Sequence, residues 1–372
     1  MKNYFKDKLI VSIEQAVAAP YCTAKLADAG ARVIKIERKE GDFARYYDDF
    51  VKGDSTYFVW LNRGKESLVA NIKNNEDVKL LKKIISKADV FVQNLGPGVL
   101  KKVGLDSSTL RKKYHSLITC DISGFGETGP YSKLKAYDLL VQAETALCSL
   151  TGTPDAPGRV GVSVCDIACG MNAYSLILEA LIKKEFSGKG SAIKISLFES
   201  LSEWMNVPFL QYFYTKSAPK RVGLSHPSIV PYGAFLTKDN KNILFSIQNE
   251  REWRAFSKEI IKVSKISESK YKTPSLRLIN KESLNSLITR EFSKLSSNIL
   301  IKKFKKLKIA FGLLNSIKDF SNHPQLKKSY VTKKNKKFVF VPPVTIENKK
   351  SFGKIPELGE HSLKIRKEFK TQ

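Results

Sequence analysis

The sequence predicts an α/β protein with a doubly wound parallel sheet in a large domain and a smaller α+β domain. Between residues 9 and 123, apolar β-rich runs alternate with short helical stretches, an order typical of parallel strands covered by helices on both faces. A predicted β-hairpin followed by a Lys-rich helical stretch near 250–320 indicates the second, smaller domain.

Strands are predicted at five places in the first part of the chain: 9–17, 31–38, 67–72, 89–95 and 115–123. The first two flank a short helix that ends at Gly30. The third and fourth flank an amphipathic helix at 75–88, whose apolar residues recur with helical spacing. Because ligands of such sheets gather at the carboxyl ends of strands, the loops after these strands are where we expect the chemistry.

The middle of the chain predicts helices at 137–150 and 165–186, a strand at 189–198 and a further helix through Trp204. Residues 206–225, with two prolines and many aromatic residues, are interpreted as a connector. Residues 232–247 predict the hairpin of the second domain.

Composition indicates a cytoplasmic enzyme. The 372-residue chain is 42% hydrophobic, and it has neither a long uncharged apolar run nor the apolar region of a signal peptide. No membrane partner is therefore expected. Five scattered cysteines without a CxxC pair indicate reduced packing residues, and four histidines without ligand spacing predict no metal site.

The net charge of +28 leaves three interpretations open. The first is a solvated, Lys-biased surface, and the second is a field that attracts anionic ligands. The third, a basic nucleic-acid-binding protein, is disfavoured because no zinc finger, RNP-type strand or helix-turn-helix accompanies the charge. We expect no nucleic-acid partner.

Gly124–Gly129 reads GFGETG, which matches the dinucleotide pattern G-x-G-x-x-G. Pro130 and a polar stretch follow it, whereas a dinucleotide fingerprint opens directly into a helix. A glycine-rich substrate or turn loop is the better interpretation.

Asp166 stands at the start of a predicted helix and is followed by the small residues Ala168, Cys169 and Gly170. On these grounds alone, an N-cap or first-turn acid is the better interpretation, and a functional carboxylate is the alternative.

Longer blocks of the sequence carry a family resemblance. They are AAPYCTAKLADAGARVIKIER (18–38), LNRGKESL (61–68), VFVQNLGPGVLKKVGL (90–105), ISGFGETGPYSKLKAYD (122–138), VSVCDIACGM (162–171), GKGSAIKISLFESL (188–201), HPSIVPYGAF (226–235), NHPQL (322–326) and PELGEHS (356–362). In these blocks the chain resembles the family III CoA-transferases, the superfamily of formyl-CoA transferase, carnitine CoA-transferases and alpha-methylacyl-CoA racemase. It looks closest to members that act on short dicarboxyl-CoA esters, such as mesaconyl-CoA or citramalate-type transferases.

The resemblance implies that Asp166 is the nucleophile. Its carboxylate would attack an acyl-CoA thioester to form a mixed anhydride, and the CoA thiolate would then give an aspartyl-CoA thioester that passes CoA to an acceptor acid. Backbone N–H groups of Cys165–Ile167 and of the Gly124–Gly129 loop are expected to stabilise the oxyanions. No resident cofactor is implied, because the CoA thioester is a substrate.

The resemblance also implies which residues bind CoA. Arg38 is expected at the adenosine phosphate, and Lys102 and Lys135 at the diphosphate end. The loop from Asn94 through Gly96 would approach the pantetheine, and Tyr137 would line the same site.

Two positions depart from family branches. Tyr137 stands where the racemase branch has a histidine, which removes one partner of a two-base proton shuttle and disfavours an acyl-CoA racemase or isomerase, the alternative on the same fold. Val17 stands where formyl-CoA transferase has a catalytic glutamine, which disfavours formyl and oxalate chemistry.

The family pattern sets the expected organisation. Residues 1–205 would form the large domain, joined by 335–372, with a linker at 206–225 and a small domain at 226–334. Two chains would interlock as an intertwined homodimer, and the partners would be acyl-CoA esters and carboxylic acids.

Overall fold

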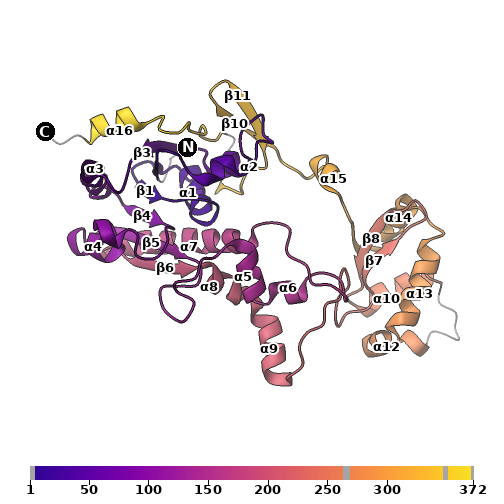
Figure 1. Cartoon of the computed structure of the whole chain (residues 1–372). Coiled ribbons are helices and arrows are strands. Elements are labelled where there is room, and N and C mark those ends of the chain that lie inside the picture. Colours follow the sequence, from indigo (N-terminus) through magenta and orange to yellow (C-terminus); the bar gives the residue numbers. More distant parts are fainter. Residues whose placement is uncertain (1–4, 263–268, 347–350, 370–372) are drawn as a thin grey trace. The chain divides into compact units, whose positions relative to one another are not determined.

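A computed structural model describes residues 5–262, 269–346 and 351–369 of the chain (Figure 1). The chain forms two compact units. The larger consists of Met1–Cys148, Arg159–Ala218 and Lys327–Gln372, and the smaller of Ser149–Gly158 and Pro219–Leu326.

The larger unit is built on a six-stranded parallel sheet with the strand order β3-β2-β1-β4-β5-β6. Its strands are β1 (Leu9–Ile13), β2 (Arg32–Glu37), β3 (Lys65–Val69), β4 (Val90–Gln93), β5 (Ile118–Ser123) and β6 (Ala192–Ser196). The direction in which successive strands are added to the sheet reverses between β1 and β4. The loop after β1 therefore leads to one face of the sheet, and the loop after β4 leads to the other face. Such a switch point is where ligands bind in open parallel sheets.

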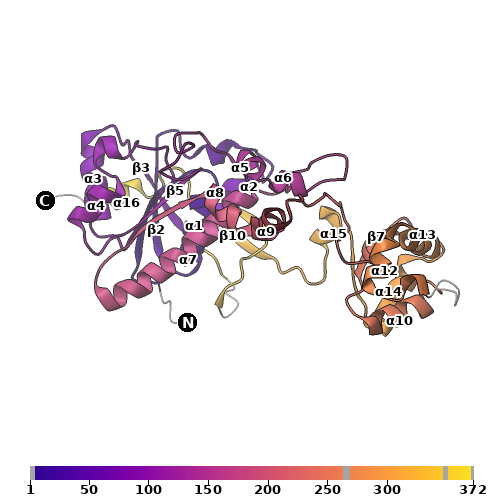
Figure 2. The same cartoon turned by 90° about the horizontal axis from the view of Figure 1, so that it is seen from below.

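Helices cover both faces of this sheet (Figure 2). The helices of the larger unit are α1 (Ala18–Asp28), α2 (Thr56–Leu61), α3 (Asn75–Ile85), α4 (Ser107–Lys113), α5 (Asp138–Glu144), α7 (Val164–Ser187), α8 (Leu197–Ser202), α9 (Asn206–Thr215) and α16 (Ser362–Glu368), with α6 (Leu147–Leu150) at the boundary between the units. Apolar residues of α1 and α7 share one core with one face of the sheet, and those of α3, α4 and α16 share a second core with the other face. The doubly wound α/β fold predicted from the sequence is confirmed.

Helix α7 is the one described helix with the length and apolar composition of a membrane span. Its residues Cys165, Cys169, Ala173 and Ile177 are fully buried in the core beside α1 and the sheet. Core helices meet the same criteria of length and composition, so this feature by itself indicates no membrane.

Among its described residues, the smaller unit contains the antiparallel sheet β7-β8-β9, with helices packed beside it. Its elements are β7 (Tyr232–Leu236), β8 (Asn242–Ser246), α10 (Glu250–Glu259), α12 (Pro274–Ile279), α13 (Lys281–Phe292), α14 (Ser297–Leu307), β9 (Ala310–Leu313) and α15 (Ile317–Ser321). Four buried rings, those of Phe245, Phe256, Phe292 and Phe304, pack against one another at the centre. The expected hairpin is present at β7 and β8, whereas β9 lies in a stretch that the sequence indicated as mostly helical. It is a strand because it pairs with β8.

The borders of the units differ from the expected ones. Residues 149–158, expected in the large domain, belong to the smaller unit. Two more differences concern the linker and the C-terminal hairpin. Residues 206–215 of the expected linker form helix α9. The hairpin of β10 (Ser329–Lys333) and β11 (Lys336–Phe340) begins before residue 335 and belongs to the larger unit, where Val331 and Phe338 are buried against Phe58 of α2. Both differences come from tertiary packing, which local patterns do not specify.

Candidate active site

Asp166 lies in the first turn of α7, and Asp138 of α5 caps that helix. Ser163 is the N-cap residue but makes no capping hydrogen bond through its side chain. Instead, Oδ1 of Asp138 accepts hydrogen bonds from the backbone N–H of Cys165 at 2.8 Å and from that of Asp166 at 3.4 Å. A carboxylate at a helix N-terminus interacts favourably with the exposed N–H groups, so Asp138 orients the turn that carries Asp166.

The same arrangement raises the pKa of Asp166. Burial disfavours its charged form, and the neighbouring Asp138 carboxylate adds like-charge repulsion, so the pKa rises to about 7. The proton affinity of Asp166 is therefore poised near neutral pH, which is typical of functional rather than purely structural carboxylates.

A cavity of about 690 Å³ lies beside Asp166 at the carboxyl ends of the sheet strands. Its wall includes residues 15–18 after β1 and residues 94–97 after β4, so it occupies the switch point of the sheet. The volume falls within the usual range of small-molecule sites.

Polar contacts, most of them partly buried, hold the two loops that form this wall. Asn94 accepts a hydrogen bond from the Gln15 N–H at 2.9 Å and donates one to the Gln15 carbonyl at 2.8 Å. Ala16 has a left-handed backbone with φ of 63°, and its N–H donates to Oδ1 of Asp42 at 3.1 Å. Oδ2 of Asp42 in turn accepts from the fully buried Lys35 ammonium at 2.7 Å.

Aromatic rings form another part of the cavity wall, which includes Phe43, Tyr47, Tyr57 and Tyr137. Tyr47 and Tyr57 meet edge to face with ring centroids 5.3 Å apart. Burial and the nearby carboxylates of Asp42 and Asp166 raise the pKa of Tyr47, which keeps its hydroxyl protonated. The wall therefore combines apolar surface with hydrogen-bond donors.

Five of the predicted site residues line this cavity: Asp166, Asn94, Gly96, Lys135 and Tyr137. The structure places the other two elsewhere. Arg38 is exposed, and its Nε donates to the Gly41 carbonyl at 3.0 Å. Lys102 is also exposed, in a short 3₁₀ helix, and its neighbour Lys101 lines a second cavity instead.

The expected oxyanion donors at Cys165–Ile167 are already engaged. The N–H groups of Cys165 and Asp166 donate to Asp138, and that of Ile167 donates to the Ser163 carbonyl at 2.9 Å. This part of the expected oxyanion site is therefore wrong for the structure as it stands, because the helix cap uses the same donors.

The loop Gly124–Gly129 is followed by turns and not by a helix, in agreement with its interpretation as a turn or substrate loop. A Cβ on Gly124 would lie 2.2 Å from the Cβ of Ala136. Only glycine permits this close approach, which brings the end of β5 against the segment that carries Lys135 and Tyr137.

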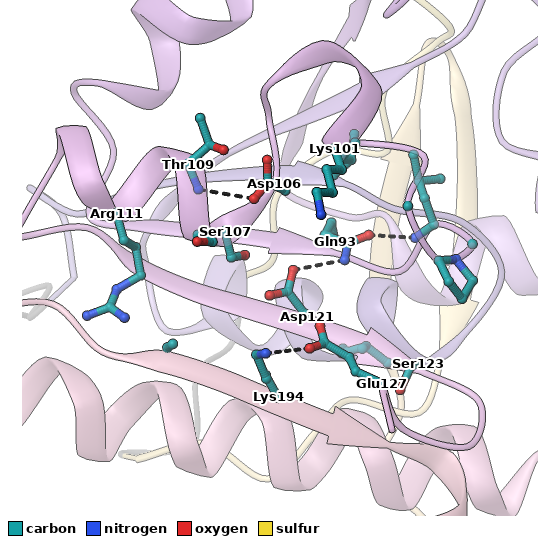
Figure 3. Close-up of a pocket in the computed structure, with 18 of the residues that line it drawn as sticks. Gln93, Lys101, Asp106, Ser107, Thr109, Arg111, Asp121, Ser123, Glu127 and Lys194 are labelled. Carbon is teal, nitrogen blue, oxygen red and sulfur yellow. Dashed lines mark hydrogen bonds and ion pairs between the residues drawn. The ribbon is translucent and has the colours of Figure 1, made fainter. Parts of the chain in front are cut away.

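The second cavity, of about 1120 Å³, adjoins the first and shares Leu95, Gly96, Pro97, Ile122 and Ser123 with it (Figure 3). Inside it, the Gln93 amide donates to Asp121 at 2.8 Å, and Lys194 pairs with Glu127. Burial raises the pKa of Asp121. The cavity offers both cations and carboxylates, without a predominance of either.

All five cysteines are free thiols. Burial raises the pKa of four of them: Cys22, Cys120, Cys165 and Cys169. Thiols of raised pKa are poor nucleophiles at neutral pH, so the carboxylate of Asp166 is the more favourable nucleophile beside the cavity.

Several residues of the cavity wall were not anticipated from the sequence, among them Tyr47, Tyr57 and Arg159. Arg159 precedes the apolar segment that leads into Asp166, and this proximity in sequence was an available signal. The two tyrosines carry no comparable signal, because they lie in a different loop and in α2.

The family model of CoA-transferase family III matches residues 5–362 of the chain. The succinyl-CoA:glutarate CoA-transferase of Mus musculus is 34% identical over 370 residues, which cover 96% of this chain and 85% of the mouse protein. The acetyl-CoA:oxalate CoA-transferase of Acetobacter aceti is 31% identical over 375 residues, 99% of this chain and 96% of its own length. The crystal structure of a CAIB/BAIF family protein from Brucella suis superposes with a TM-score of 0.87 at 28% identity, covering 98% of this chain and 99% of that one.

Proposed function

The chain belongs to CoA-transferase family III and is a CoA-transferase, and from this premise we propose that it moves CoA between short dicarboxylic acids through a covalent intermediate on Asp166. The observation that carries the proposal is the position of Asp166. It is a carboxylate with a pKa of about 7 beside a cavity at the switch point of the sheet.

The proposed reaction uses Asp166 as a nucleophile. Its carboxylate attacks the carbonyl of the donor thioester, the C–S bond breaks, and a mixed anhydride and the CoA thiolate result. The thiolate attacks the aspartyl carbonyl, which releases the donor acid and leaves an aspartyl-CoA thioester. The acceptor carboxylate attacks the aspartyl carbonyl of this thioester, the C–S bond breaks, and a second mixed anhydride and the CoA thiolate result. The thiolate then attacks the acceptor carbonyl of this anhydride, which forms the new acyl-CoA and releases the Asp166 carboxylate. Each difficult transfer is thereby divided into easier steps.

CoA would lie across the loop after β4. Asn94 and Gly96 line the cavity there, and Lys135 and Tyr137 lie on its wall, where a cation and a hydroxyl suit the diphosphate and the pantetheine. Arg38 and Lys102 are retained as proposed contacts for the more distant nucleotide phosphates, since both side chains are exposed; to bind there, Arg38 would release its hydrogen bond to the Gly41 carbonyl.

Short dicarboxylates are the proposed acyl groups because they agree with the relatives. The mouse and Acetobacter proteins are named for glutarate and oxalate, two dicarboxylic acids, and the mouse protein also for succinyl-CoA. Succinyl-, mesaconyl- and citramalyl-type esters are our first choices, with CoA moving between molecules or within one dicarboxylate. Oxalate, which Val17 disfavours, belongs in the test because of the Acetobacter relative.

We further propose a homodimer that works in the cytoplasm without a nucleic-acid or membrane partner. Helix α9 supports the dimer because it exposes Val207, Phe209, Leu210, Tyr212, Phe213 and Tyr214. An apolar surface of this kind marks an interaction site more often than a solvated one. Native mass spectrometry should give twice the chain mass of 41.9 kDa; a monomer would contradict the proposal.

The decisive experiment combines a substrate panel with a trap. Succinyl-, mesaconyl-, citramalyl-, acetyl- and formyl-CoA are offered with glutarate, succinate, mesaconate and oxalate as acceptors. Hydroxylamine or borohydride added during turnover should modify one peptide, at Asp166, and D166A should abolish both modification and transfer. Turnover in D₂O should leave the α-carbon of 2-methylacyl-CoA unlabelled, whereas rapid labelling would indicate a racemase. Normal transfer by D166A would disprove the covalent mechanism.

A further inference from the structure

The cavity beside Asp166 must accommodate one more negative charge if the acyl group is dicarboxylic. Its wall already carries the carboxylates of Asp138 and Asp166 together with the cations Lys133, Lys135 and Arg159. In this partly buried site, the distal carboxylate of the acyl group would lie near Asp138 and Asp166. That arrangement is unfavourable unless a cation pairs with the distal carboxylate. The wall should therefore contain a cation available for the far end of the acyl chain.

Arg159 is the cation best suited to this purpose. Within residues 5–262, 269–346 and 351–369, its guanidinium makes no hydrogen bond or ion pair, yet it lines the cavity together with Ser163 and Asp166. A guanidinium can donate two parallel hydrogen bonds to one carboxylate, whereas a lysine ammonium is a point charge.

The backbone beside Arg159 is held by the residue that also contacts the helix cap. Fully buried Gln142 accepts from the Val160 N–H at 2.9 Å and donates to the Val160 carbonyl at 3.3 Å. The same Gln142 amide donates to Oδ2 of Asp138 at 2.7 Å. Through Gln142, the backbone next to Arg159 is therefore fixed relative to the turn that carries Asp166. A residue that binds the same small substrate as Asp166 needs such a fixed position.

Lys133 and Lys135 fit a different part of the substrate. Both are exposed on the segment between the Gly124–Gly129 loop and α5, outside any element of regular structure. CoA itself carries phosphates, and these two point cations are the partners proposed for them. This assignment leaves Arg159 for the acyl end.

We infer that Arg159 binds the distal carboxylate of the dicarboxylic acyl group and of the acceptor acid, and so selects dicarboxylates over monocarboxylates. The inference rests on the proposed function and names the group that recognises the substrate class.

The test compares pairs of substrates that differ only in the distal group. Succinyl-CoA and butyryl-CoA are the donors, and glutarate and pentanoate are the acceptors. R159Q should lower kcat/KM for succinyl-CoA roughly 10- to 100-fold, the loss expected for hydrogen bonds to a charged group. It should leave kcat/KM for butyryl-CoA within about threefold. R159K retains the positive charge but cannot donate two parallel hydrogen bonds. Its kcat/KM for succinyl-CoA should therefore lie between those of R159Q and the wild type. R251Q, which removes an exposed arginine of the smaller unit, is the matched control.

The outcomes separate the two proposals. A wild type that transfers CoA to no dicarboxylate refutes the proposed substrate class itself. A wild type that does so, with a succinyl preference unchanged in R159Q, overturns the inference alone. An equal loss for succinyl- and butyryl-CoA also overturns it, because the role of Arg159 would then be general positioning. Thermal unfolding verifies that each variant is folded, and R159K provides the comparison if R159Q is not.

Discussion

Asp138 and Asp166 are joined through the backbone of α7: Oδ1 of Asp138 accepts the Asp166 N–H at 3.4 Å while capping Cys165 at 2.8 Å. Asp138 thus has two opposite effects on its neighbour. It orients the turn that carries Asp166, and its charge helps to raise the pKa of the Asp166 carboxyl group.

The variant D138N separates these two effects. Asparagine retains an oxygen that can cap α7 but removes the charge, so the pKa of Asp166 should fall from about 7 toward its usual value while burial keeps it above that value. The acid limb of kcat/KM against pH should therefore move to lower pH. An unmoved limb would show that Asp138 does not influence the titrating group.

The same variant carries a structural cost. The new amide faces the Gln142 amide that now donates to Oδ2, so unfolding should become easier by about 1 kcal/mol. D155N, at an exposed acid of the smaller unit, should change neither the stability nor the pH profile.

Asp166 itself should limit stability above neutral pH. Its folded-state pKa of about 7 lies above the reference value of 3.8, so its contribution is fully present below pH 3.8 and lost as the pH rises through 7. D166N cannot ionise. It should therefore gain up to about 4 kcal/mol over the wild type at pH 8, and less than about half of that at pH 5. Urea unfolding at the two pH values measures this difference, and an equal gain at both would contradict the assignment.

The buried ammonium of Lys35 supports the loop before α1. Its Nζ lies 2.7 Å from Oδ2 of Asp42, and both side chains are fully buried. K35M should cost about 3 to 5 kcal/mol because it leaves a buried carboxylate without its partner. The exposed neighbour Lys39 gives the control K39M, which should stay within about 0.5 kcal/mol. Equal effects of the two variants in chemical unfolding would refute the role of the buried pair.

Gly170 allows α7 to approach α1 closely. A Cβ at this position would lie 2.6 Å from the Ala18 carbonyl oxygen and 3.0 Å from the Cβ of Tyr21. G170A should destabilise the protein by about 1 to 3 kcal/mol through overpacking, and should lower activity because Ala18 lines the cavity. G161A, where a Cβ meets no atom within 4 Å, is the matched control. A thermal midpoint of G170A as high as that of G161A would contradict this packing argument.

Most of the sheet could be predicted because its signals are local. Apolar runs ending at glycine or polar residues placed β1, β2, β4 and β5 correctly to within a few residues. Helix α9 and strand β9 were missed for the opposite reason. Helix α9 has no polar face, since apolar and aromatic residues occur around most of it and are exposed, so it lacks the amphipathic pattern that predicts a helix. Strand β9 is a strand because it pairs with β8, which local sequence does not indicate.

For the site, the family blocks pointed to Asp166 and Asn94, and both line the cavity. Arg38 and Lys102 were also implied by the family resemblance, but they do not line this cavity, because a single position along a loop decides which way a side chain faces. Lys101 faces the second cavity and Lys102 faces solvent.

The sequence by itself determined the order of strands and helices along the chain, because hydrophobic periodicity is a local property, and hence that the chemistry was to be expected in the loops at the carboxyl ends of the strands. Only the tertiary structure decided that Asp138, 27 residues before Cys165, caps the helix that carries Asp166, that the backbone N–H groups expected as oxyanion donors there are occupied, and that Arg159 lines the same cavity. The helix cap, the burial of Asp166 and its raised pKa all depend on groups that are distant in the chain. These groups interact only after folding has brought them together.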